Sequence, residues 1–149
     1  MADLRPANKN DLAILRRLDD RCFDEAWSEK IWLGWLSNPK RYRCWLLMEA
    51  DVALGFLLFG VVLDEAELLR IGVDPARQGE GLAAAMLRTV QSGLAAQGVA
   101  SCHLEVRESN YAAQRLYQHC GWTPSGRRRN YYAAEDGSED ALLFTLGLD

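Results

Sequence analysis

The stretch "VDPARQGEGLAAAMLRTV", residues 73–90, joins a glycine-rich loop to the start of an amphipathic helix. Glycines let a backbone approach an anion closely, and the first turn of the helix offers unpaired N–H groups and the positive end of its dipole. Residues 79–84 therefore predict a cradle for a pyrophosphate. A plain glycine turn in front of a core helix would also explain the loop taken alone.

The loop fits two phosphate-binding patterns. The dinucleotide fingerprint G-x-G-x-x-A begins at Gly79, and a second pattern, Q-x-x-G-x-A, begins at Gln78. Glu105, at the end of the next predicted strand, could hold the ribose of a dinucleotide. Against this interpretation, five residues separate the preceding strand from Gly79, the unit begins after a predicted meander, and little chain remains for a second mononucleotide half. We therefore favour the second pattern.

Glu105 is the first candidate for acid–base chemistry. In the predicted strand 101–106, it shares one face with Ser101 and His103. It lies near the carboxyl end of a strand expected to be central and parallel, where ligands of open α/β sheets bind. A glutamate on a solvated face would explain the same position. His103 is an alternative base, whereas His119 lies late in a predicted helix, where a cation is ordinary.

Tyr117 lies on the apolar stripe of the helix predicted over residues 110–120. That position is typical of a core aromatic residue, but a buried tyrosine needs a partner for its hydroxyl, and a departing thiolate would be one. Asn110 at the helix start is ordinary capping when taken alone. Cys102 faces away from Glu105 on its strand, so we do not assign it as a nucleophile.

Hydrophobic periodicity and turn residues predict the elements that position these side chains. We expect helices over 10–21, 29–37, 82–94 and 110–120, and strands over 3–7, 42–49, 53–63, 67–73, 101–106, 127–132 and 141–146. Asn10 or Asp11 is expected to cap the first helix and Ser28 the second. Short connectors predict an antiparallel meander over 42–73, and the later strand-loop-helix-strand unit predicts one parallel crossover. The sequence therefore indicates one mixed α/β domain over residues 1–149.

Composition limits the classes of partner. The 149 residues, with 49% hydrophobic and 26% charged side chains, suit one domain, and a net charge of −4 argues against direct nucleic-acid binding. Four scattered cysteines without a C-x-x-C pair argue against a zinc site and favour reduced thiols. No apolar run could span a bilayer or serve as a signal peptide. We expect a cytoplasmic monomer without a metal or a membrane partner.

Four segments resemble a known family across nearly the whole chain: "AWSEKIW", "VVLDEAELLRIGVDP", "LEVRESNYAAQRLY" and "RRRNYYAAEDGSEDALLF". With the loop, they resemble the GNAT N-acetyltransferases, and within these the bacterial ribosomal-protein-alanine N-acetyltransferases. The resemblance implies the α/β GNAT (acyl-CoA N-acyltransferase) fold, a mixed central sheet flanked by helices. Its two parallel strands, here 67–73 and 101–106, are expected to splay apart and admit the pantetheine arm of acetyl-CoA.

The resemblance also implies roles for single residues. It implies that Glu105 is the catalytic base and that Tyr117 is the acid. The acetyl-CoA contacts carry over to Ile71, Gly72, Val73, Gly79, Glu80, Gly81, Leu82, Ala83, Ala84 and Asn110. Trp27, Tyr131 and Tyr132 become contacts for the acceptor peptide, although cross-strand packing in a hairpin would also explain the two tyrosines. Asp64, Glu65 and Glu67 could attract a basic acceptor or only solubilise a turn.

The implied acceptor is the N-terminal alanine of small-subunit ribosomal protein eighteen. A GNAT enzyme acting on a lysine side chain or a small amine is the alternative, and a non-catalytic acyl-CoA sensor is a second class. The presence of both Glu105 and Tyr117 argues against the sensor. Two departures from relatives, "DEA" before Trp27 and Ala133 where relatives often have proline, lie near the expected acceptor and bear on substrate choice.

Overall fold

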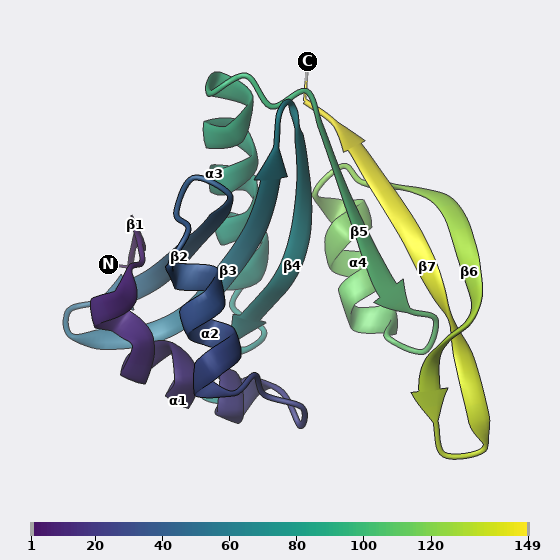
Figure 1. Ribbon diagram of the computed structural model, residues 1–149, viewed down its shortest axis with the longest axis horizontal. Helices are drawn as coiled ribbons and strands as arrows, with labels where there is room; N and C mark the ends of the chain where they lie inside the picture. The colour runs from purple at the N-terminus through teal and green to yellow at the C-terminus, as the bar shows by residue number, and fades with distance from the viewer. Residues whose placement is uncertain (1, 149) are drawn as a thin grey trace.

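The computed structural model describes residues 2–148, which form a seven-stranded sheet in the order β1-β2-β3-β4-β5-β7-β6 (Figure 1). The strands are β1 Asp3–Pro6, β2 Tyr42–Glu49, β3 Val52–Val62, β4 Glu65–Val73, β5 Ser101–Arg107, β6 Thr123–Ala134 and β7 Gly137–Gly147. The helices are η1 Lys9–Asp11, α1 Leu12–Cys22, α2 Glu29–Leu36, η2 Pro75–Arg77, α3 Leu82–Ala96 and α4 Tyr111–His119. All of these strand pairs are antiparallel except β4–β5, which confirms the mixed sheet with one parallel crossover.

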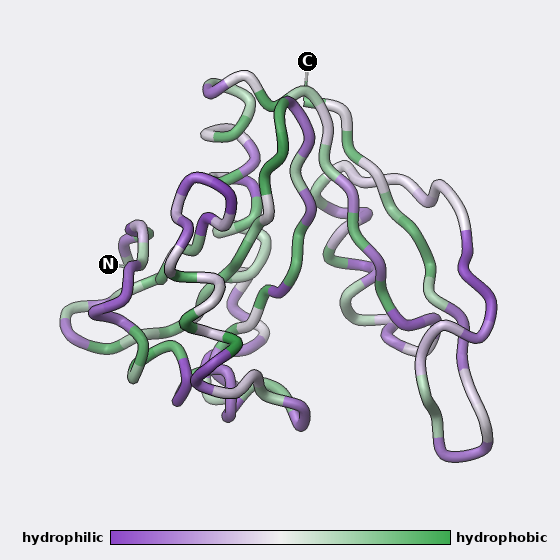
Figure 2. Tube along the Cα trace, viewed as in Figure 1, coloured by the Kyte–Doolittle hydropathy of each residue, from purple (hydrophilic) through white to green (hydrophobic). Residues whose placement is uncertain are grey.

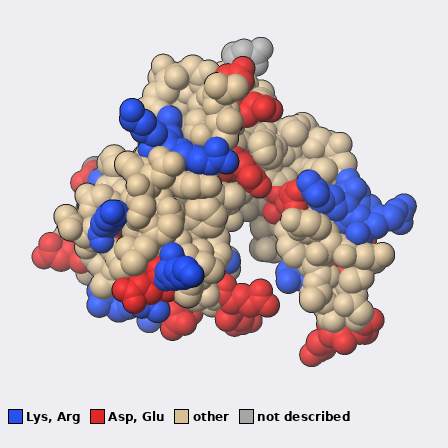
Figure 3. Space-filling model, viewed as in Figure 1, with Lys and Arg blue, Asp and Glu red and all other residues tan. Residues whose placement is uncertain are grey.

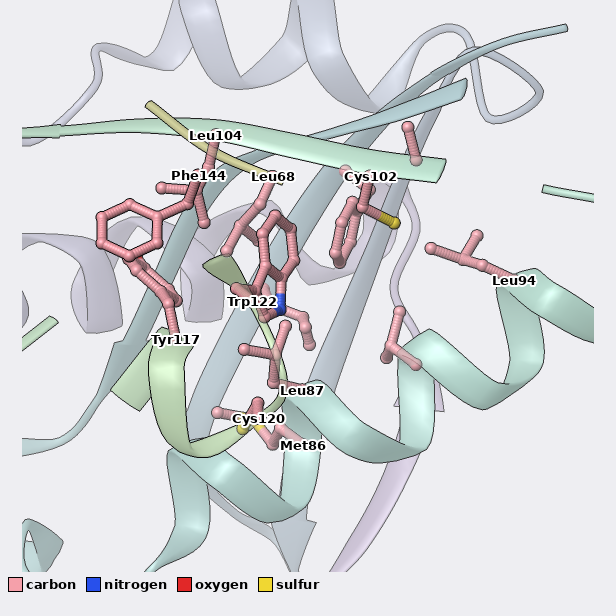
Figure 4. Packing of buried hydrophobic residues seen from close by; sticks show 14 of the residues in the cluster. Leu68, Met86, Leu87, Leu94, Cys102, Leu104, Tyr117, Cys120, Trp122 and Phe144 are labelled. Carbon is pink, nitrogen blue, oxygen red and sulfur yellow. The ribbon is translucent and has the colours of Figure 1, made fainter. Parts of the chain in front are cut away.

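Helices cover both faces of the sheet and bury two separate clusters. α1 and α2 pack on one face over Leu46, Phe56 and Leu58. α3 and α4 pack on the other face, where Leu87 and Trp122 belong to the larger cluster (Figure 4). The hydropathy trace is mostly hydrophobic along β3 and hydrophilic along the middle of β6 (Figure 2). The sheet is therefore packed on both faces along β3 and exposed at the β6 edge.

Several strand boundaries differ from the sequence-based prediction, and β7 begins at Gly137 rather than at Ala141. β4 begins at Glu65, because the turn after β3 uses Leu63, with φ 55°, and Asp64. β6 begins at Thr123, four residues before the predicted start at Arg127. Pro124 lies within β6, which is an edge strand, where a missing N–H donor is tolerated.

The first helix is capped earlier than predicted. Asn8, not Asn10 or Asp11, supplies the capping side chain, which accepts from the N–H of Asn10 at 2.8 Å. Asp11 completes a reciprocal capping box by accepting from the N–H of Asn8 at 2.9 Å. The short η1 turn therefore comes between the cap and α1. Ser28 caps α2 as predicted, because its Oγ accepts from the N–H of Ile31 at 3.2 Å.

The two parallel strands splay apart, as the family resemblance implied. β4 and β5 pair only where Glu65, Ala66 and Glu67 meet Ser101, Cys102 and His103. From Leu104 onward, β5 pairs with β7 alone. The β3–β4 register shifts so that Leu69 lies opposite no residue of β3, and such a bulge bends and twists its strand. The bulge begins two residues after the last β4–β5 pair, so it turns β4 away from β5 and opens a gap, which we call the β4–β5 gap.

Within the described residues, every helix is too short or too polar to cross a membrane.

Candidate active site

The backbone of β4 is free to bind an extended chain along the β4–β5 gap. Asp74 donates its N–H to the carbonyl of Leu54 on β3 at 2.8 Å. Because hydrogen-bonding residues alternate along an antiparallel ladder, the N–H groups of Ile71 and Val73 point away from β3 and toward the gap. The last β5 partner lies at Glu67, so β5 does not pair with these groups. An elongated ligand with amide groups could therefore take the place of a strand here.

The glycine loop leads into an uncapped helix. Gly79 and Gly81 adopt φ values of 86° and 78°, which favour glycine. Gly81 occupies the N-cap position of α3 without a side-chain cap, and the first backbone bond of the helix runs from Ala85 to Gly81. A Cβ atom on either glycine would meet no protein atom within 4 Å. The N–H groups of the first turn thus have no capping side chain at Gly81, which suits the binding of a pyrophosphate there.

Side chains hold the loop in this shape. Gln78 donates from Nε2 to the carbonyl of Val73 at 3.2 Å, which ties the loop back to β4. Arg77 pairs with Glu80 at 2.9 Å and with Glu49 at 3.2 Å. The hydrogen bond from Arg77 holds the pKa of Glu80 below its ordinary value. The Glu80 side chain is thus paired within the protein, so a contact of Glu80 with acetyl-CoA would involve its backbone.

Glu105 lies on β5 just beyond the last residue that pairs with β4. Its strand neighbours Leu104 and Val106 belong to the cluster under α3 and α4, so Glu105 points to the opposite face, the one that α1 and α2 cover. The Glu105 side chain is 19% exposed. It forms an ion pair with Arg128, whose Nε lies 2.9 Å from Oε1 of Glu105. A partly shielded carboxylate at the edge of the gap fits a general base.

Tyr117 approaches the gap from the other face of the sheet. Its ring packs 6.1 Å from Phe144 and 6.0 Å from Trp122 (Figure 4). Burial raises the pKa of Tyr117 above its ordinary value, and nearby Tyr132 raises it further. The pKa of Tyr132 is raised by burial and then by the charge of Glu105. Tyr117 therefore keeps its proton at neutral pH, as a general acid must.

The two side chains predicted to act as base and acid lie on opposite faces of the sheet. Glu105 lies on the α1–α2 face and Tyr117 on the α3–α4 face, in the hydrophobic cluster against which the first residues of α3 pack. Cys102 is buried, and burial raises the pKa of its thiol to about 11. A thiol that stays protonated is a poor nucleophile, so direct transfer between two substrates fits the site better than a covalent enzyme intermediate.

A buried ion pair holds the segment between α1 and α2 beside the gap. Asp19 is fully buried and accepts from Arg70 at 2.7 Å and from the indole of Trp32 at 2.9 Å. Asp19 also accepts the backbone N–H of Trp27 at 2.8 Å. The guanidinium of Arg70 lies 3.9 Å from the centroid of the Trp27 ring and 4.5 Å from that of Phe23. These contacts fix Trp27 next to β4. Trp27 is one of the residues predicted to contact the acceptor peptide.

The other predicted acceptor contacts lie on the β6–β7 hairpin. Tyr131 is 51% exposed, and its ring lies 5.0 Å from that of Tyr132 in an edge arrangement. The guanidinium of Arg107 covers the Tyr132 ring at 4.4 Å. Asn110 caps α4 through Oδ1, which accepts from Ala113 at 3.1 Å. Tyr132 therefore lies close enough to Glu105 for the carboxylate charge to raise its pKa, while Asn110 caps α4 and has an exposed side chain.

The surface is hollowed between the two halves of the molecule, and acidic side chains appear on both sides of the hollow (Figure 3). The acidic residues of the adjoining loops are Asp24 and Glu25 before α2 and Glu135 and Asp136 at the hairpin turn. Basic side chains gather instead over β6 on the outer side. Within residues 2–148, no three His, Cys, Asp or Glu side chains are grouped as metal ligands would be.

Comparison with known proteins agrees with this geometry. The model of the acetyltransferase (GNAT) family matches residues 12–122. The chain belongs to the GNAT acetyltransferase family. The [ribosomal protein bS18]-alanine N-acetyltransferase of Escherichia coli K12 is 39% identical over 136 residues, which cover 91% of this chain and 90% of that enzyme. The Haemophilus influenzae enzyme of the same name is 33% identical over 141 residues, 93% of each chain.

A solved structure has the same fold as this chain. The crystal structure of the ribosomal-protein-S18-alanine N-acetyltransferase from Escherichia coli matches this acetyltransferase with a TM-score of 0.93 and 36% identity, over 100% of this chain and 95% of that one. The GNAT fold is therefore confirmed. The dinucleotide interpretation of the loop is wrong, because this sheet is not a doubly wound parallel sheet.

Sequence reasoning missed three features of this GNAT site. Arg128 was not expected to pair with Glu105, and Gln78 was not expected to bind the β4 backbone. The Asp19–Arg70 pair was also missed, since 51 residues separate its members. One signal was present: Asp19 falls four residues after Leu15, on the apolar face of its helix, where a charged residue needs a partner.

Proposed function

We propose that this acetyltransferase transfers the acetyl group of acetyl-CoA to the N-terminal α-amine of a protein, namely the N-terminal alanine of ribosomal protein bS18. The observation that carries the proposal is the 39% identity, over nine-tenths of both chains, to an enzyme named for that reaction. A ribosomal acceptor also fits an enzyme of the cytoplasm, where ribosomes are found.

Acetyltransferases of this family take their acetyl group from acetyl-CoA. The residues present fit that substrate: the uncapped start of α3 suits the pyrophosphate, and the free N–H groups of Ile71 and Val73 suit the amide-rich pantetheine arm. The N–H of Val73 is the simplest group to polarise the acetyl carbonyl. In the proposal, acetyl-CoA enters from the α3–α4 face and the acceptor from the α1–α2 face, so that they meet in the β4–β5 gap.

The reaction requires that the attacking amine lose a proton and that the departing thiolate of CoA gain one. An α-amine with a pKa of about 7.7–8.0 is roughly one-tenth neutral at pH 7, whereas a lysine amine, with a pKa of about 10.4, is almost fully protonated. The difference of about 2.5 units corresponds to roughly 3.4 kcal/mol. An N-terminal amine thus needs only a modest base. In the proposal, Glu105 accepts the amine proton, and Tyr117 donates a proton to the sulfur as the C–S bond breaks.

Acceptor choice tests the proposed function directly. The purified enzyme is incubated with acetyl-CoA and a peptide that has the first residues of bS18, and fragment masses locate the added acetyl group. We expect the group on the α-amine of alanine. The same peptide with its α-amine blocked and its lysine side chains free should gain no mass. Acetylation of lysine side chains in the blocked peptide, at a rate equal to that of the free peptide, would contradict the proposal.

Replacing Tyr117 by phenylalanine tests the proposed acid. The ring contacts with Phe144 and Trp122 remain, so the free energy of unfolding should change by less than about 1 kcal/mol. We expect kcat to fall by about tenfold rather than more, because a thiol with a pKa near 8.5 departs moderately well without its proton. Steady-state kinetics measures kcat, and thermal unfolding checks the fold. An unchanged kcat would remove Tyr117 from the mechanism.

A further inference from the structure

Arg128 reaches the proposed base from two strands away. On β6, Arg128 lies opposite Ala141 of β7, and Ala141 in turn lies opposite Arg107 of β5. Glu105 lies one pleat further along, opposite Leu143. The guanidinium therefore crosses β7 to place Nε 2.9 Å from Glu105 Oε1. The small side chain of Ala141 leaves room for this crossing.

The same guanidinium also contacts the proposed acceptor clamp. Its carbon lies 5.3 Å from the centroid of the Tyr131 ring. Between Arg128 and Tyr132 the β6–β7 register shifts, and Asn130 within that bulge has a φ of 54°. Asp140 fixes the bulge by accepting the N–H of Asn130 at 2.9 Å. Arg128 thus contacts both the Glu105 carboxylate on β5 and the exposed Tyr131 ring of the hairpin.

The ion pair between Arg128 and Glu105 contributes little to the stability of the fold. The Arg128 side chain is 56% exposed, and exposed ion pairs contribute little to folding. What the pair does change is the freedom of Glu105, since an unrestrained glutamate samples several rotamers. The recorded contact joins Nε to Oε1, so the guanidinium restrains the carboxylate from the Oε1 side.

We propose that Arg128 is a positioning residue of the acetyl transfer. It holds one oxygen of Glu105 so that the other faces the acceptor amine in the β4–β5 gap, and it links the orientation of the base to Tyr131 at the acceptor side. The proposal rests on the role proposed above for Glu105. It concerns the acceptor half of the site, so the binding of acetyl-CoA at the glycine loop does not depend on Arg128.

The test replaces Arg128 by methionine, which is an unbranched side chain without the guanidinium that pairs with Glu105. We expect kcat to fall by about tenfold with saturating bS18 peptide, while the Kd for acetyl-CoA changes by less than about twofold. In a Glu105→Gln background, the same replacement should change the remaining rate by less than about twofold, because a residue that acts through Glu105 has nothing left to orient. Arg128→Lys should recover part of the rate, since it restores a cation near the carboxylate.

Arg129→Met is the matched control, because it removes the same charge from the next position of β6 without removing the partner of Glu105. It should keep kcat within about twofold. An unchanged kcat in Arg128→Met would overturn the positioning role, as would an equal tenfold loss with and without Glu105. Full activity of Glu105→Gln alone would instead disprove the assignment of Glu105 as the base. Because this variant is measured before the Arg128 variants, the failure of the base assignment is distinguished from the failure of the positioning role.

Discussion

Glu105→Gln is expected to lower kcat by about a hundredfold or more at pH 7 and to leave the Kd for acetyl-CoA within about twofold. Glutamine keeps the size of the side chain and can still accept from Arg128, but its amide cannot take up a proton. The carboxylate faces the α1–α2 side of the sheet, away from the glycine loop, so the loss should appear in turnover rather than in coenzyme binding.

The size of this loss should depend on pH in a definite direction. At pH 7 only about a tenth of the acceptor α-amines are neutral, whereas at pH 9 more than about nine-tenths are. A base contributes most where the amine still carries its proton, so the ratio of wild-type to variant kcat should shrink as the pH rises. Steady-state rates with bS18 peptide between about pH 6.5 and 9.5 measure this ratio.

Glu108→Gln is the control for the charge change. Glu108 follows β5 by one residue and pairs with Arg127 at 3.1 Å, outside the β4–β5 gap. Its replacement removes the same charge and should keep kcat within about twofold. If Glu105→Gln retained full turnover at every pH, no proton would pass through this carboxylate, and the Tyr132 hydroxyl beside it would become the next group to examine.

The sequence predicts the order of the elements because periodicity and turn residues are local signals. The helix after the glycine loop and the strand that carries Glu105 were both predicted close to their observed bounds. The splay was not deducible in this way. It depends on the bulge at Leu69, and nothing in "ELLRIGV" marks one residue as unpaired. Only the resemblance to a family indicated it.

In the candidate site, too, features with a local sequence signal were predictable, and contacts between distant residues were not. Position made Glu105 a candidate and placed Tyr117 in the core, and the family resemblance supplied both roles, whereas the ion pair of Glu105 with Arg128 depends on how β6 lies against β7. Asn8 was overlooked as a cap because a short 3₁₀ turn comes before α1, and sequence patterns locate helix ends only to within a few residues. Features that bring together residues far apart in the chain, such as Asp19 with Arg70, require the folded structure.

Gly81→Val is expected to raise the Kd for acetyl-CoA by about a hundredfold. The new side chain would project into the open space before α3, where the pyrophosphate is proposed to lie. A β-branched residue also disfavours the φ of 78° that aims the first N–H groups of the helix. Each backbone bond lost to a charged group costs about 1.5–3 kcal/mol, so losing one or two of them gives roughly this factor. Titration calorimetry with acetyl-CoA measures the Kd.

Gly98→Val separates backbone strain from lost contact with the ligand. Gly98 lies just beyond the opposite end of α3, has a φ of 93°, and, like Gly81, has no protein atom within 4 Å of an added Cβ. Both variants should therefore lose a similar free energy of unfolding, about 1–2 kcal/mol. Only Gly81→Val should also lose affinity for acetyl-CoA. Equal affinity losses in the two variants would mean that general destabilisation, and not a pyrophosphate at the start of α3, explains the effect.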